Sequence, residues 1–182
     1  TDFAIPGNAD AFANRANVST TSLTKTAWLP VFWVPLYTQG ATLFGQYEKI
    51  DYAFNFTNRA PSSRGITWND GYEEPTILLK AGYQLDPALR LGLNFSQGPY
   101  LRLDAQANLA PGQSTGDFDQ TLFGIDLTWE HRDWQVWSEF YWSQFDIPNV
   151  RDSAQIYSWY VEARRQMGTR WWLSGRWNQE FY

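Results

Sequence analysis

The sequence predicts an all-β protein, an antiparallel up-and-down β-barrel that spans a membrane. Apolar and polar residues alternate from Ile50 to the C-terminus. A period of two indicates strands, because successive side chains point to opposite faces of a sheet. The segments that connect these stretches alternate strictly between short and long. A spanning barrel sorts its connections in this way, because its periplasmic turns are short and its extracellular loops are long.

The composition fits a barrel wall without selecting it. Charged residues make up 18% and aromatic residues 18% of the 182 residues, yet the mean hydropathy is only −0.48. A barrel wall exposes every second residue to lipid and so combines both properties. A secreted, sugar-binding β-sandwich would have the same composition. The net charge of −5 argues against nucleic acid as a partner, and the absence of Cys excludes disulfides and thiolate chemistry.

Seven to eight strands are expected. Residues 1–25 are small and polar and are predicted to form a loop or tail, and residues 26–182 to form the barrel segment. The first strand, 26–37, is interrupted by two prolines, which favour an edge or a bulge. A long second strand, 41–58, alternates cleanly only after Glu48 and Lys49. The remaining strands are predicted at 75–85, 89–97, 118–130, 134–145, 153–166 and 170–182.

The two phases of the alternation assign side chains to lipid or to the barrel interior. Tryptophans close to the short turns are expected to form an aromatic girdle at one membrane interface. The predicted lipid-facing and girdle residues are Tyr52, Phe54, Phe56, Trp129, Trp134, Trp142, Trp159 and Trp171. The predicted pore-lining residues are Asp51, Lys80, Arg90, Asp126, Glu139, Tyr160, Glu162, Arg164 and Arg176.

The predicted interior carries charges of both signs. A ring of one sign would favour ions of the opposite sign, and this mixture favours neither. Opposed acidic and basic walls would produce a transverse field, whereas cross-strand ion pairs such as Glu162 with Arg176 would have a structural role. Trp137, Tyr141, Tyr160 and Trp172 fall in the same phase. They would form a sugar-binding surface or contact a plug or loop.

The sequence offers little for catalysis or metal binding. Its one histidine, His131, lies in a predicted tight turn, where a solvated role is expected rather than that of a catalytic base. The carboxylate pairs Asp117 with Asp119 and Glu73 with Glu74 lie in loops. The segment Asn69–Glu74 offers oxygen ligands but lacks the spacing of a calcium loop. We therefore expect no enzymatic activity, no cofactor and no metal site.

The turn lengths predict an orientation. If the short turns are periplasmic, strands 41–58 and 170–182 both run outward, and strand 26–37 runs inward. Both ends of the chain then lie outside, whereas complete bacterial barrels start and end in the periplasm. The expected assignment is therefore an interior segment of a larger barrel.

Several stretches resemble bacterial porins, in particular relatives of the phosphate-selective porins. They are Tyr47–Asn58, Leu91–Tyr100, Asp117–Asp126, Tyr160–Arg165 and Leu173–Trp177. The resemblance implies a passive outer-membrane channel, typically of sixteen strands and often trimeric, and carries no information about the solute.

The leading hypothesis is a porin-type channel of the bacterial outer membrane for small hydrophilic solutes or ions, with lipid, solutes and further copies in a homotrimer as partners. Two alternatives remain: a secreted carbohydrate-binding β-sandwich, and a barrel scaffold that encloses a partner protein.

Overall fold

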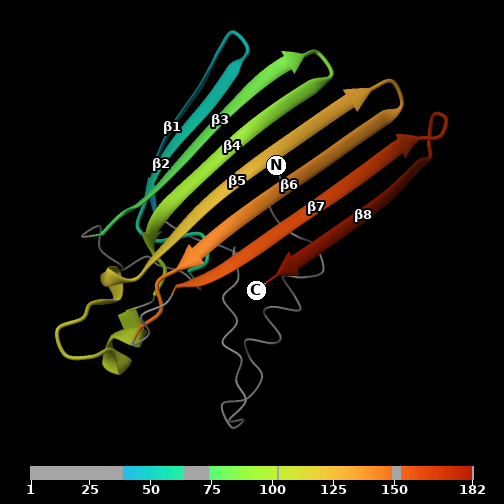
Figure 1. Cartoon of the computed structure of the whole chain (residues 1–182). Helices are drawn as coiled ribbons and strands as arrows, with labels where there is room; N and C mark the ends of the chain where they lie inside the picture. Colours follow the sequence, from blue (N-terminus) through green and yellow to red (C-terminus); the bar gives the residue numbers. More distant parts are fainter. Residues whose placement is uncertain (1–38, 64–73, 102, 149–152, 182) are drawn as a thin grey trace.

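A computed structural model describes residues 39–63, 74–101, 103–148 and 153–181. It contains one antiparallel sheet of eight strands that pair in chain order (Figure 1). The strands are β1 Gly40–Tyr47, β2 Ile50–Thr57, β3 Thr76–Asp86, β4 Leu89–Pro99, β5 Asp119–His131, β6 Trp134–Phe145, β7 Ala154–Gln166 and β8 Trp172–Phe181. The all-β antiparallel meander predicted from the alternation is therefore confirmed.

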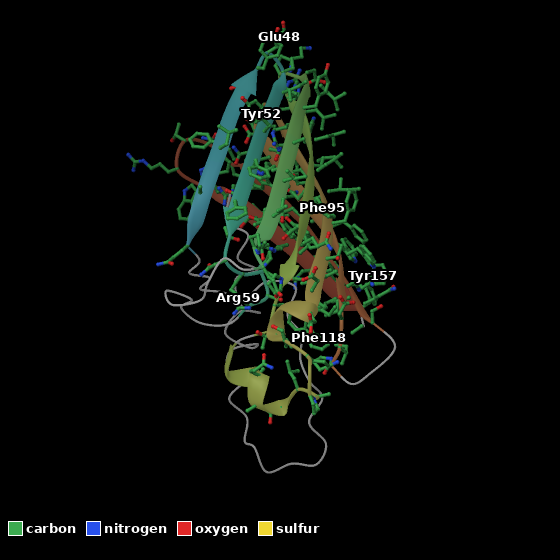
Figure 2. All side chains as sticks on the ribbon, turned by 90° about the vertical axis from the view of Figure 1, so that its left-hand side faces the viewer. Glu48, Tyr52, Arg59, Phe95, Phe118 and Tyr157 are labelled. Atoms are coloured by element: carbon green, nitrogen blue, oxygen red, sulfur yellow. The ribbon has the colours of Figure 1, made fainter. Side chains whose placement is uncertain are left out.

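The connections sort by length to opposite ends of the sheet. The turns β1–β2, β3–β4, β5–β6 and β7–β8 are short and lie together at one end, and the three longer connections lie at the other (Figure 1). In Figure 2, Glu48 marks the short-turn end, and Arg59 and Phe118 lie towards the long-loop end. Two short 3₁₀ helices, η1 Leu103–Asn108 and η2 Thr115–Asp117, belong to the β4–β5 connection.

The prediction of one long strand over 41–58 is wrong. The chain turns at Glu48 and Lys49, and β1 pairs with β2 so that Tyr47 lies opposite Ile50. Glu48 takes a positive φ of 52°, which a two-residue hairpin turn commonly requires. Because the turn has two residues, the side chains of the apolar face occupy odd-numbered positions in β1 and even-numbered positions in β2. The break in alternation at Glu48 and Lys49 was thus the signal of this turn.

The other strands lie close to their predicted bounds. Strand β6 has the predicted limits, and β3, β4, β5 and β7 differ from the prediction by two residues or fewer at each end. Strand β8 begins at Trp172, so Trp171 belongs to the preceding turn. The predicted loop 1–25 and strand 26–37 lie outside the described residues. The described residues alone form eight strands, because residues 40–57 hold two of them.

The sheet is not closed. Strands β1 and β8 are its edges, and each pairs with only one strand among the residues that the structure describes. In the same part of the chain, no helix is long and apolar enough to cross a bilayer.

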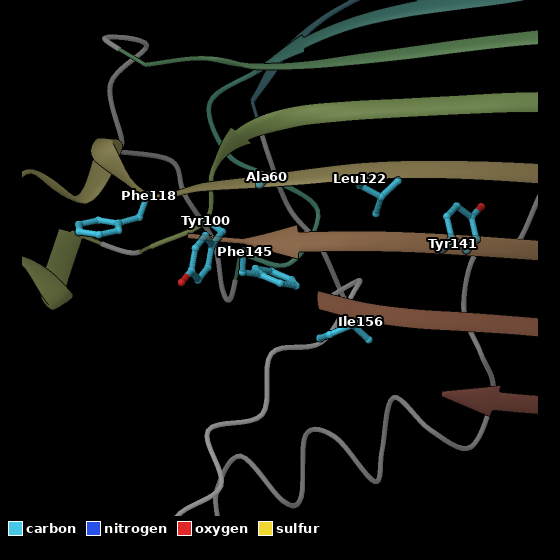
Figure 3. Close-up of a cluster of buried hydrophobic side chains, with 7 residues drawn as sticks. All are labelled: Ala60, Tyr100, Phe118, Leu122, Tyr141, Phe145 and Ile156. Carbon is cyan, nitrogen blue, oxygen red and sulfur yellow. The ribbon is translucent and has the colours of Figure 1, made fainter. Parts of the chain in front are cut away.

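A compact apolar cluster lies at the long-loop end of the sheet. Phe145, Ile156 and Leu122 are 0%, 1% and 3% exposed, and Tyr100 packs edge-on against Phe145 with ring centroids 5.1 Å apart (Figure 3). The register places the three strand residues on the same face as Asp51 and Asp126. The core of the described chain therefore lies on the face that carries the charges, under the connections at that end.

The segment Asn58–Ser63 is held against this core. Every residue in it is buried. The N–H of Ala60 donates to the Pro99 carbonyl at 3.0 Å, and the N–H of Ser62 donates to Gln120 Oε1 at 3.0 Å. The Arg59 guanidinium donates to the Leu101 carbonyl at 2.7 Å. After leaving β2, the chain thus folds over the charged face of the sheet instead of extending away from it.

Candidate functional site

The two faces of the sheet differ sharply, and we name them by their chemistry. The polar face carries Asp51, Arg90 and Asp126, and the apolar face carries Phe54, Phe123 and Trp142. Because directly paired residues share a face, the register assigns every strand residue to one of them. All nine predicted interior residues fall on the polar face: Asp51, Lys80, Arg90, Asp126, Glu139, Tyr160, Glu162, Arg164 and Arg176.

Arg90 joins two carboxylates across the polar face. Its Nε and Nη2 donate to the two oxygens of Asp51 at 2.8 and 2.6 Å, and its Nη1 donates to Asp126 Oδ1 at 2.7 Å. Asn94 donates to the other Asp126 oxygen at 3.0 Å. The guanidinium therefore ties β2 to β5 through β4, and its charge is compensated within the sheet.

Two glycines make room for this cluster. Gly82 and Gly92 lie between Asp51 and Asp126 in one row of paired residues that crosses the sheet. A Cβ at Gly82 would collide with the Arg90 guanidinium and the Asp51 carboxylate, and one at Gly92 would collide with the Asp126 carboxylate. The absent side chains let the charged groups lie flat on the backbone.

A second cluster on β6, β7 and β8 combines charges with aromatic rings. Glu162 lies 3.5 Å from Arg176 and 3.9 Å from Arg164, which confirms the predicted cross-strand pair. The Arg176 guanidinium lies 3.8 Å from the centroid of Tyr160. Arg164 lies over Trp137 and Trp172 at 5.3 and 5.8 Å. The aromatic side chains of the predicted interior are therefore covered in part by arginines of the same face.

Between these clusters lies a carboxylate beside two phenols. The side chain of Glu139 interacts electrostatically with those of Tyr160 and Tyr141. Glu139 follows Asp126 in the same row of paired residues and lies opposite Tyr160 on the next strand. The polar face therefore carries charges of both signs, several of which are paired with one another.

One row on the apolar face is predominantly aromatic. The register places Leu43, Phe54, Leu79, Phe95, Phe123, Trp142, Tyr157 and Phe181 side by side across all eight strands. Phe95 and Tyr157 project from the same side of the sheet in Figure 2. The next row towards the long-loop end is polar over four strands: Gln97, Thr121, Gln144 and Gln155. Over β4 to β7 the aromatic row therefore marks a boundary between apolar and polar surface, whereas Phe56 and Ile77 continue the apolar surface on β2 and β3.

The apolar surface continues from that row to the short-turn end. Large apolar side chains are well exposed along it, including Leu93 at 52% and Trp177 at 62%. On β6 it runs from Trp134 to Trp142, about 27 Å along a strand at about 3.4 Å per residue. A strand tilt of about 40° would reduce its height to about 21 Å, close to the apolar band of barrels that span an outer membrane.

The predicted lipid-facing residues in the strands all fall on the apolar face. They are Tyr52, Phe54, Phe56, Trp129, Trp134, Trp142 and Trp159. Trp171 is 76% exposed in the turn before β8. Trp159 lies opposite Phe140, away from the short turns, so it does not belong to an aromatic girdle at the short-turn end of the sheet. Ser138 breaks the apolar pattern, but its hydroxyl donates to the Tyr160 carbonyl at 3.0 Å.

Sequence reasoning missed the residues that hold the Asn58–Ser63 segment. Gln120 is fully buried, accepts from the Ser62 N–H and donates to Ser143 Oγ at 2.9 Å. The alternation places Gln120 among the polar-face residues, but it does not show that Gln120 bonds to Ser62 in the loop. Beside the segment, a cavity of about 280 Å³ opens on the polar face. Its lining is Gly40, Thr42, Asn55, Thr57, Arg59, Pro61 and Leu78.

The residues considered as candidates for catalysis or metal binding make structural contacts. His131 ends β5 and stacks against Trp129 at 6.1 Å. The Asp117 carboxylate accepts from the Ser114 N–H at 2.7 Å and caps η2, and Asp119 accepts from Gln97. Within the described ranges no group of three or more His, Cys, Asp or Glu residues is placed to hold a metal ion. Residues 69–73 of the calcium candidate lie outside them.

Neither a family model, nor a curated protein, nor a solved structure matches this chain.

Proposed function

We propose that this chain forms part of the wall of a porin-type β-barrel in the bacterial outer membrane and allows small hydrophilic solutes or ions to diffuse passively. The observation that carries the proposal is the apolar face, which over β4 to β7 is bounded at one end by an aromatic row and a row of three glutamines and one threonine. A water-soluble sheet would have to cover this band with other protein, because contiguous exposed apolar surface of this extent is rare on soluble monomers.

The polar face supports the channel side of the proposal. Ion pairs join β2, β4 and β5 in one cluster and β7 and β8 in another, as on a wall in contact with water. Asn58–Ser63 folds over the same face and would narrow the interior near the long-loop end. Because the charges are mixed and mutually paired, the proposed channel discriminates weakly between anions and cations.

The open sheet supports a larger barrel. Strands β1 and β8 each leave one edge without a partner among the described residues, and a barrel in lipid must pair all its edges. We therefore include further strands, in a barrel of about sixteen as the porin resemblance implies, as part of the proposal.

Two adjacent residues on β4 provide a matched test of membrane contact. Leu93 lies on the apolar face, one row from the aromatic row, and Asn94 lies on the polar face, hydrogen-bonded to Asp126. Leu93→Arg places a cation in lipid, which costs about 2–4 kcal/mol at the bilayer centre and less towards the interfaces. Asn94→Arg places the cation in the aqueous interior of the proposed barrel, next to the Asp126 carboxylate.

The measurement is the folding equilibrium of the closed barrel that includes this chain, in phospholipid vesicles, followed by urea titration. We expect Leu93→Arg to lose at least 1 kcal/mol more than Asn94→Arg. Equal losses, or folding in buffer as a soluble monomer without lipid or detergent, would overturn the proposal. The latter result would favour the β-sandwich. Conductance of a reconstituted assembly would then distinguish a channel from a scaffold.

A further inference from the structure

The apolar face carries one arginine, and its position is unusual. Among the described strand residues, Arg165 is the only lysine or arginine in the apolar phase. It belongs to the row of His131, Trp134 and Leu173, the last paired row at the short-turn end. The cation thus stands where the apolar surface meets the short turns.

Arg165 has no carboxylate partner in the described part of the chain. Its guanidinium lies over the Trp134 ring at 5.3 Å from the centroid, and with the described residues it makes no other side-chain hydrogen bond, ion pair or ring contact. Arg164, the adjacent residue on the polar face, has Glu162 3.9 Å away. The two neighbouring arginines therefore differ in charge compensation, and only Arg165 retains a full positive charge for an outside partner.

The surroundings of Arg165 add positive charge and aromatic surface. The two turns beside it hold Arg132, Asp133 and Arg170, which together contribute one further positive charge. Trp171 is 76% exposed in the same region. Tryptophan and arginine at the border of an apolar band are the side chains that occupy the headgroup region of a bilayer.

We infer that Arg165 and Trp134 form a docking site for the phosphate of an anionic phospholipid, in the leaflet on the short-turn side. The inference rests on the proposed membrane function. Charge complementarity selects the occupant: a guanidinium forms paired hydrogen bonds with phosphate oxygens, and its apolar neighbour Leu173 on β8 would lie against the acyl region. Trp134 holds the guanidinium at the border and leaves its N–H groups available to the headgroup.

The test compares vesicles of phosphatidylcholine with vesicles that also contain phosphatidylglycerol. We expect phosphatidylglycerol to raise the folding equilibrium constant of the wild-type chain, with Arg165 accounting for a factor of about five. Arg165→Gln should lose that factor. The matched control, Arg164→Gln on the polar face, should retain it.

Four outcomes decide the inference. Loss of the gain in Arg165→Gln alone supports it. An unchanged gain in Arg165→Gln overturns it while leaving membrane insertion, tested by Leu93→Arg, intact. A gain reproduced by inorganic phosphate in phosphatidylcholine vesicles also overturns it, since the site would then take the anion from water. Failure of the closed barrel that includes the wild-type chain to insert in either vesicle overturns both this inference and the proposed function.

Discussion

Gly82 lies directly beneath the Arg90 guanidinium, and any Cβ at that position would collide with Arg90 and with the Asp51 carboxylate. The glycine is therefore a condition for the ion pair that joins β2 to β4. Since the colliding atoms are the flexible ends of side chains, a larger residue would displace the ion pair before it disturbed the sheet.

Gly82→Ala should therefore weaken the Arg90–Asp51 pair. We expect the variant to be about 1 kcal/mol less stable than the matched variant Gly175→Ala, whose Cβ meets no atom within 4 Å. The measurement is the free energy of unfolding by urea titration. Salt should reduce the difference between the variants, because it screens the lost pair. Identical stabilities would show that the glycine has no such role.

Gln120→Ala should release the Asn58–Ser63 segment. The substitution leaves the buried Ser62 N–H without its acceptor, at a cost of about 1–3 kcal/mol. The expected result is a lower free energy of unfolding together with faster limited proteolysis near Ser62. Gln97→Ala, on the apolar face, should change stability by less than about 0.5 kcal/mol. Unchanged proteolysis in Gln120→Ala would contradict this anchoring role.

Tyr100 should make stability depend on alkaline pH. Burial raises its pKa to about 12, and its hydroxyl donates to the Asp146 carbonyl at 2.9 Å. Since the unfolded phenol titrates near pH 10, the folded state binds more protons between these values. Stability from this group is complete below about pH 10 and is lost as the pH rises towards 12, by roughly 2 kcal/mol.

The check compares unfolding free energies at about pH 8 and about pH 11.5, on either side of the expected loss. Tyr100→Phe should show a smaller alkaline decline than the wild type. Tyr83→Phe, on the apolar face, should leave the decline in place. An equal decline in Tyr100→Phe and wild type would remove Tyr100 as its source.

Asp86→Ala should destabilise the β3–β4 hairpin. Asp86 Oδ1 accepts from the N–H groups of Ala88 at 2.7 Å and Leu89 at 3.1 Å, and so organises the turn at Pro87. We expect a loss of about 1 kcal/mol in the free energy of unfolding. Asp133→Ala in the β5–β6 turn is the control, because the Asp133 side chain accepts no hydrogen bond from the part of the chain that the structure describes. If both variants lose the same stability, the turn does not depend on these bonds.

Most strands could be predicted from the alternation because period two follows from backbone geometry. Strands β3 to β8 and both faces of the sheet could be read in this way. The error over 41–58 had a local cause, since the phase break at Glu48 and Lys49 was visible but two-residue turns without glycine give a weak signal. The compact apolar cluster of Leu122, Phe145 and Ile156 was harder to predict. Alternation assigns a residue to a face but does not say what covers that face.

The sequence by itself determined the strands, the two chemically distinct faces and the alternation of short and long connections, because each depends on neighbouring residues. Only the tertiary structure decided which residues lie side by side. Pairing of strands distant in sequence aligned Phe54, Phe95 and Phe123 into an aromatic row, brought Arg90 between Asp51 and Asp126, and set Asn58–Ser63 over Gln120. Such contacts follow from register and loop closure, which no local pattern encodes.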